Sequence, residues 1–113
     1  MIEYEVVRNA IRSYVLDDAP EYGDMAHNDE ELDRWIIQAG FEILNLKRHL
    51  CVDKNGEPRN SSEVIGDTSV DFPQKYFGAL MHGALMFAFS EDQQRSSFER
   101  GQFYAQLGLG GKR

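Results

Sequence analysis

The sequence predicts an all-α protein, a small four-helix domain with a long polar loop or weak β-hairpin between the second and third helices. Three observations predict this fold. Residues 72–90 are apolar nearly all round, as in a helix that other elements wrap. Residues 28–49 combine helix-start signals with an apolar seam at helical spacing. The 113 residues are enough for one domain with a single core, and we expect a helical domain over 1–107 and a C-terminal tail over 108–113.

The first helix is expected from Glu3 to Leu16. Its apolar residues fall on one face of such a helix: Val7, Ile11, Tyr14 and Val15. The connection Asp17–His27 follows, with Pro20 and Gly23 as helix breakers. Its acidic side chains indicate a solvated loop.

The second helix is expected from Asn28 to His49. Asn28 can cap its start, and Glu31 three positions later completes a pattern like a capping box. Acidic residues crowd the first turn and basic residues the last, which suits the helix dipole at both ends. A seam with spacings of four and three residues runs along it: Leu32, Ile36, Ala39, Ile43, Leu46 and Leu50. Such a seam packs along its length against another helix.

Additional apolar residues lie off this seam, and they are the candidate subunit interface: Trp35, Ile37, Phe41 and Leu44. A helix of 22 residues spans about 33 Å at 1.5 Å per residue. With apolar residues on more than one face, it either packs inside a small monomer or faces another subunit. The sequence leaves both alternatives open.

Cys51–Val70 forms a long polar connection between the second and third helices. Connections of this length without structure are uncommon in compact domains. Asn55-Gly56 is typical of a hairpin turn, whereas Pro58 would interrupt the returning strand early. We therefore expect a loop or weak hairpin that reaches away from the helices.

The third helix is expected within Phe72–Ser90, with Asp71 as a cap and Pro73 in its first turn. Small residues recur at four-residue spacing: Ala79 with Gly83, and Ala84 with Ala88. Glycine costs roughly 1 kcal/mol of helix propensity against alanine, so close packing of a neighbour is the expected reason for Gly83. The apolar run of 14 residues is shorter than the roughly 20 that a membrane span needs.

The fourth helix is expected to start at a box-like pattern from Ser90 to Gln93 and to run to about Leu107. Gly108 and the glycines after it predict its end. Lys112 and Arg113 close the chain.

Composition and charge exclude several classes of function. The formal net charge is −7, the wrong sign for gripping nucleic acid through its phosphates or for binding an anionic membrane surface. The first residues have neither the basic region nor the apolar run of a signal peptide. The single cysteine, Cys51, cannot form an internal disulfide and fits a reducing compartment.

Few residues suggest chemistry. The soft-ligand candidates are His27, His49, His82 and Cys51, and their spacing does not match a zinc site. His82, on an apolar helix, is expected to be a core histidine whose hydrogen bonds are satisfied. The carboxylates of Glu30, Glu31 and Asp33 are explained by the helix start. We therefore expect no enzyme activity, no cofactor and no metal.

Three stretches carry a resemblance to a known family: DFPQKYFGALMHGALMFAF, EDQQRSSFERGQFYAQLGLG and WIIQAGFEILNLKRH. The first resembles a proline-led helix with alternating Ala, Leu and Gly. The second is similar to a following helix that ends the domain, and the third to a long second helix. Together with the order of the helices, they resemble the head-tail connector proteins of tailed bacteriophages, also called adaptors or head-completion proteins. Cys51–Val70 is the least typical part.

The resemblance implies a structural virion protein without catalysis. Connectors of this type form a ring, commonly twelve-fold, in the neck region between the portal and the next tail or neck protein. They extend the channel through which DNA passes, and an acidic wall would let DNA slide without sequence-specific binding. The C-terminal segment often docks onto the portal. Here the candidate docking residues are Leu107, Leu109, Lys112 and Arg113.

Two other classes of function remain open. One is a small intracellular helical adaptor or regulator that forms a homodimer through its second helix. The mass of the pure protein in solution distinguishes this homodimer from a connector. An isologous dimer closes at two copies, whereas a connector is a monomer or a large ring. The other is an enzyme with an all-helical pocket, which a bound ligand in purified material would indicate.

Overall fold

The protein is mainly α-helical, with five α-helices and one two-stranded sheet in the part that the structure describes. The structure is a computed structural model that describes residues 1–18 and 28–109. In chain order the elements are β1 (Ile2–Glu3), α1 (Tyr4–Asp18), α2 (Asp29–Leu46), η2 (Arg48–Cys51), α3 (Ser61–Val64), β2 (Ser69–Val70), η3 (Gln74–Tyr76), α4 (Phe77–Ala88) and α5 (Gln93–Gln106). The connection Asp17–His27 expected from the sequence lies outside the described residues except for its first two, which end α1.

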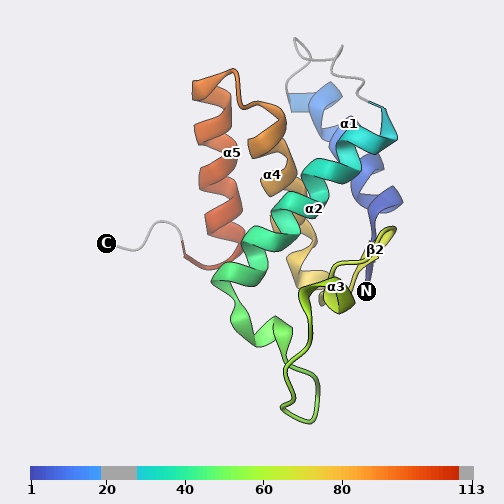
Figure 1. Ribbon diagram of the computed structural model, residues 1–113. Helices are drawn as coiled ribbons and strands as arrows, with labels where there is room; N and C mark the ends of the chain where they lie inside the picture. The colour runs from blue at the N-terminus through green and yellow to red at the C-terminus, as the bar shows by residue number, and fades with distance from the viewer. Residues whose placement is uncertain (19–27, 110–113) are drawn as a thin grey trace.

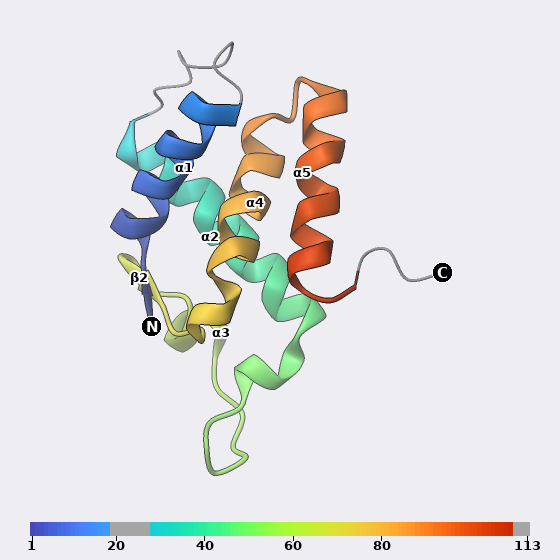
Figure 2. The ribbon, with the colours of Figure 1, turned by 180° about the vertical axis from the view of Figure 1, so that it is seen from behind.

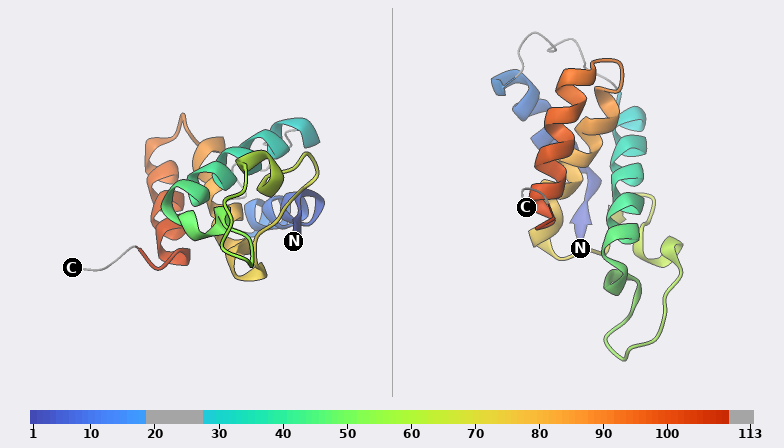
Figure 3. Two further views of the ribbon diagram at one scale, coloured as in Figure 1. Left: turned by 60° about the horizontal axis from the view of Figure 1, so that its bottom comes forward. Right: turned by 90° about the vertical axis from the view of Figure 1, so that its left-hand side faces the viewer.

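Helix α4 occupies the centre of the fold (Figure 1). Seen from behind, it lies between α1 and α5, and α2 crosses the opposite face (Figure 2). The side view in Figure 3 shows α2 as a second layer against the other three long helices. This position explains why α4 is apolar nearly all round, since neighbours cover it on three sides.

The N-terminus is tied to the segment before α4. Strands β1 and β2 pair antiparallel, with Ile2 opposite Val70 and Glu3 opposite Ser69. The Tyr4 backbone N–H donates to the Thr68 carbonyl, and the buried Tyr4 hydroxyl donates to the Gly66 carbonyl at 2.7 Å. Burial, followed by the charges of Asp33 and Asp67, raises the pKa of Tyr4 to about 12. The expected start of the first helix at Glu3 was therefore early by one residue, because Glu3 is held in the sheet.

Helix α2 begins as expected. The Asn28 side chain accepts a hydrogen bond from the backbone N–H of Glu31 at 2.9 Å. The first four seam residues are fully or nearly fully buried: Leu32, Ile36, Ala39 and Ile43. The helix ends earlier than expected, at Leu46, because Lys47 leaves the helical conformation (φ −126°, ψ 73°). The predicted basic last turn was therefore wrong, and Leu46 is 39% exposed rather than part of the seam.

Ion pairs join Arg8 and Arg12 of α1 to Asp29 and Asp33 near the start of α2. The Arg8 and Asp33 side chains lie 2.7 Å apart, and the Arg12 and Asp29 side chains 2.8 Å apart. The hydrogen bond to Asp33 raises the pKa of Arg8. The hydrogen bond from Arg12, helped by the charge of Arg8, lowers the pKa of Asp29. These carboxylates thus do more than favour the helix dipole, since they also fix α1 against α2.

The segment 51–70 contains more structure than a loop. A turn at Gly56 (φ +83°) brings the Asp53 N–H to the Glu57 carbonyl, and Val52 bridges Pro58. This turn projects beyond the helices at the lower end of Figure 1. Helix α3 and strand β2 follow, neither of which the sequence predicted, and Asn60 and Glu63 form a capping box at α3. Arg59 fastens the segment to the body by donating to Asp71 and to the Leu50 carbonyl.

The last two long helices start later than expected. Gln74–Tyr76 forms a 3₁₀ turn before α4, and Pro73 precedes it in an extended conformation. Helix α5 is capped by Asp92, whose carboxylate accepts from the Arg95 N–H, and not by Ser90. Ser90 is instead part of the turn that leaves α4, where its N–H donates to the Phe87 carbonyl.

The described residues include no helix with the length and apolarity needed to cross a bilayer.

Candidate functional site

Polar side chains meet where α1, α4 and α5 pack together: the buried His82 and Glu99 and the half-buried Tyr14 and Arg95. We call these four residues the polar cluster. Glu99 on α5 is its centre and is 0% exposed. Its Oε2 atom accepts hydrogen bonds from the Tyr14 hydroxyl at 2.9 Å and from Arg95 Nη2 at 2.9 Å. Its Oε1 atom lies 2.7 Å from His82 Nδ1. A buried carboxylate is costly unless it is paired and hydrogen-bonded, and Glu99 has three partners.

Arg95 lies one helical turn before Glu99 on α5, so its guanidinium reaches both Glu99 and Tyr14. The guanidinium carbon also lies 5.1–5.5 Å from the ring centroids of Tyr14, Phe89 and Phe98. Aromatic faces at this distance attract a cation. The Arg95 Nε atom is buried and has no hydrogen-bond partner among the described residues.

His82 meets the cluster from α4, and its ring packs edge-on against Tyr14 at a centroid distance of 5.4 Å. The expectation of a buried, hydrogen-bonded histidine is confirmed, since His82 is buried and bonded to Glu99. The sequence did not identify that partner.

A pocket of about 420 Å³ opens next to the polar cluster. Its lining comes from α1, α4 and α5: Tyr14, His82, Arg95, Phe98 and Gln102. We call it the cluster pocket. It combines two aromatic rings, a cation, an imidazole and an amide. This arrangement can bind a small polar molecule by hydrogen bonds and enclose it between rings.

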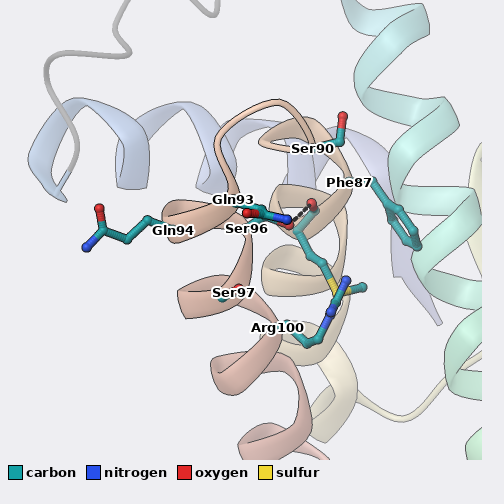
Figure 4. A pocket seen from close by; sticks show the side chains of 8 residues that line it. Phe87, Ser90, Gln93, Gln94, Ser96, Ser97 and Arg100 are labelled. Atoms are coloured by element: carbon teal, nitrogen blue, oxygen red, sulfur yellow. Dashed lines mark hydrogen bonds between the residues drawn. The ribbon is translucent and has the colours of Figure 1, made fainter.

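A second, wider pocket of about 740 Å³ lies between α4 and α5 (Figure 4). Its lining is mostly uncharged and polar: Met86, Phe87, Ser90, Gln93, Gln94, Ser96, Ser97 and Arg100. Ser96 donates to the Met86 carbonyl at 2.9 Å, and Arg100 Nε lies 3.5 Å from the Met86 sulfur. Gln94 points away from the other lining side chains (Figure 4). The serine hydroxyls and glutamine amides that line this second pocket can form hydrogen bonds. Its lining includes no buried charged side chain such as Glu99 beside the cluster pocket.

The candidate interface residues of α2 are not all surface residues. Leu44 is 6% exposed and belongs to the chain's own core, so its assignment to surplus surface was wrong. Trp35 and Ile37 are half-buried and pack against that core. Phe41, at 44% exposed, is the member of the set that remains open to a partner. Leu44, Trp35 and Ile37 are covered because both α4 and the segment after α2 pack against α2, so its buried surface is broader than the predicted seam.

The candidate docking residues at the C-terminus also include both buried and exposed side chains. Leu107 is 4% exposed and part of the core, because it follows Glu99 and Phe103 at four-residue spacing on the buried face of α5. Leu109 follows the helix-ending Gly108 (φ +75°) and is exposed. Lys112 and Arg113 lie outside the described residues.

Glu99 is the functional candidate that sequence reasoning missed. An acidic residue in a helix is ordinarily on the solvent side. The sequence did contain an indication that Glu99 is buried. The apolar residues Phe103 and Leu107 follow it at four and eight residues, so all three lie on the same face of a helix. Arg95 four residues earlier supplied a possible partner for a buried carboxylate.

Within 1–18 and 28–109, no three or more His, Cys, Asp and Glu side chains are grouped closely enough to hold a metal ion. No family model, curated protein or solved structure was found to match this chain.

Proposed function

We propose that this chain is a non-catalytic structural protein of a tailed bacteriophage, located in the virion neck. In this proposal it forms a ring between the portal and the next tail or neck protein and extends the DNA channel. The long helices α1, α2, α4 and α5 form the connector-like body, and the segment 51–70 is its excursion. The proposal starts from the resemblance carried by Asp71–Phe89 and the stretches before and after it.

The observation that best supports the proposal is the shape of the subunit. The chain extends over 47 × 37 × 21 Å, so it is flat. The turn at Gly56 projects beyond the helices at one end of the body (Figure 1). A ring subunit needs broad sides for its neighbours and separate projections for the proteins above and below. This flat body with a projecting turn suits that role.

The net charge and two exposed apolar side chains also support the connector proposal. A net charge of −7 per subunit gives a ring an acidic character, and an acidic channel wall repels the phosphates of passing DNA. The exposed Phe41 on α2 and Leu109 after α5 are large apolar side chains that a neighbour could cover. In the proposal, Phe41 contacts the next subunit and the tail from Gly108 onward contacts the portal.

Disrupting the gene in the phage genome that encodes it tests the proposed function. Electron microscopy of the lysate should show DNA-filled heads separated from free tails, and expression of the wild-type chain from a plasmid should restore complete particles. A variant truncated at Gly108 should fold with an unchanged melting temperature but fail to restore them. Complete, infectious particles from the disrupted genome would refute the proposal.

The homodimer alternative is supported by the exposure of Phe41 beside the half-buried Ile37. Sedimentation velocity over a concentration series separates the two functions. A connector should sediment as a monomer or as a large ring, whereas an isologous dimer stops at two copies. A stable dimer that Phe41→Asp converts to monomers would favour the alternative.

A further inference from the structure

We propose that the cluster pocket binds a hydrogen phosphate group, either free or as a monoester on a small molecule. This binding site is independent of ring assembly. It follows from what the polar cluster leaves available on the pocket side, namely one hydrogen-bond acceptor and several donors between two aromatic rings.

The acceptor is the second nitrogen of His82. An ionised carboxylate only accepts hydrogen bonds, and Glu99 Oε1 lies 2.7 Å from His82 Nδ1. The hydrogen-bond network therefore assigns the proton of the neutral ring to Nδ1. Nε2 is then left with a lone pair, and among the described residues it has no hydrogen-bond partner. His82 lines the pocket, so a ligand that donates a hydrogen bond can use this nitrogen.

The donors are Arg95 and Gln102. Arg95 uses Nη2 for both Glu99 and Tyr14, and its Nη1 has no hydrogen-bond partner among residues 1–18 and 28–109. Gln102 lies on the same face of α5 one turn after Phe98, and its amide can also donate. These groups can bind the oxygen atoms of an anion.

The unused acceptor on His82 narrows the choice of ligand. The charged and titratable groups around His82 are Glu99 and Arg95 from α5 and Tyr14 from α1, and the Arg95–Glu99 pair is neutral as a whole. A ligand that carries its own proton can donate it to His82 Nε2, whereas an anion without a proton would place an acceptor against that lone pair. Hydrogen phosphate has such a P–OH donor together with acceptor oxygens. Sulfate and the phosphodiesters of nucleic acid have no proton at neutral pH, and the net charge of −7 further disfavours a polyanion.

NMR titration of the ¹⁵N-labelled full chain tests the proposal, with the histidine ring nitrogens as the readout. Sodium phosphate at neutral pH should shift the His82 Nε2 signal in a saturable way, with a dissociation constant on the order of 1 mM. Sulfate and a phosphodiester oligonucleotide lacking terminal phosphates should bind at least ~10-fold more weakly. O-phosphoserine binding more tightly than phosphate would identify a small phosphorylated molecule, and equal affinities would identify free phosphate.

Two substitutions on α5 form a matched pair. Gln102→Glu adds a negative charge at the cluster pocket and should weaken phosphate binding at least ~10-fold, because like charges repel. Gln94→Glu adds the same charge at the other pocket and should leave the affinity unchanged. Both side chains are at least partly exposed, so both variants should fold, which their melting curves check. Equal affinities in the two variants, an unmoved His82 signal, or sulfate binding as tightly as phosphate would overturn the proposal.

Discussion

Gly83→Ala tests the closest contact in the core. A Cβ atom at Gly83 would lie 2.8 Å from the Ala39 Cβ and 2.9 Å from two ring carbons of Phe103. Both neighbours are fully buried. Alanine at 39 has no rotamer to change, so either α2 or the Phe103 ring must move. Overpacking of this kind costs about 1–3 kcal/mol, whereas alanine gains about 1 kcal/mol of helix propensity over glycine. We therefore expect a net loss of about 1 kcal/mol.

Gly101→Ala is the matched control for this substitution. Gly101 lies within α5 and is exposed, and nothing lies within 4 Å of an added Cβ. The same gain in propensity applies, so Gly101→Ala should stabilise the protein by about 0.5–1 kcal/mol. Urea unfolding of the two variants measures the steric cost alone, because the propensity contribution cancels in their difference. If Gly83→Ala were as stable as Gly101→Ala, the close approach of α2, α4 and α5 would be wrong.

Three further substitutions test the core, the N-terminal anchor and the ion pairs between α1 and α2. Ile43→Ala, at a fully buried position, should lower the unfolding free energy by about 2–5 kcal/mol in urea, and a loss under ~1 kcal/mol would mean that the α2 seam is misplaced. Because the pKa of Tyr4 is raised to about 12 from 10, the unfolded state releases this proton first. Wild-type stability should therefore fall by up to roughly 2–3 kcal/mol more than that of Tyr4→Phe as the pH rises across this interval. Equal losses in the two proteins would show that the Tyr4 hydroxyl is not held against Gly66. Because Arg12 lowers the pKa of Asp29 below 3.8, this carboxylate stabilises the fold above that pH and stops doing so as the pH falls through its folded value. The small difference in melting temperature between wild type and Asp29→Asn should accordingly vanish in acid, and a difference that persists there would have another cause.

Much of the helical architecture follows from local signals. The cap at Asn28 and the spacing of Leu32, Ile36, Ala39 and Ile43 specify where α2 starts and which face it buries. The all-round apolar composition of residues 76–89 identifies the central helix without knowledge of its neighbours. Such features are visible in the sequence because capping and helical periodicity involve residues only three or four positions apart.

Helix ends and strand pairing were less predictable. Lys47 could continue a helix by composition, yet the chain leaves α2 there and turns through η2. The pairing of Ile2 with Val70 joins segments that are 68 residues apart, and strands of two residues show no periodicity of their own. Contacts between distant segments determine both the end of α2 and the pairing of β1 with β2, so neither can be predicted from a local sequence pattern.

The candidate site likewise has features that the sequence predicts and features that depend on contacts between distant segments. The sequence by itself determined that His82 lies in an apolar helix, that the chain is acidic, and that Gly83 needs a close neighbour. Only the tertiary structure decided that Glu99 is buried and that Tyr14, 85 residues away from it, donates to its carboxylate. The physical reason is that a buried carboxylate depends on partners from other elements, and those partners meet only when α1, α4 and α5 pack together.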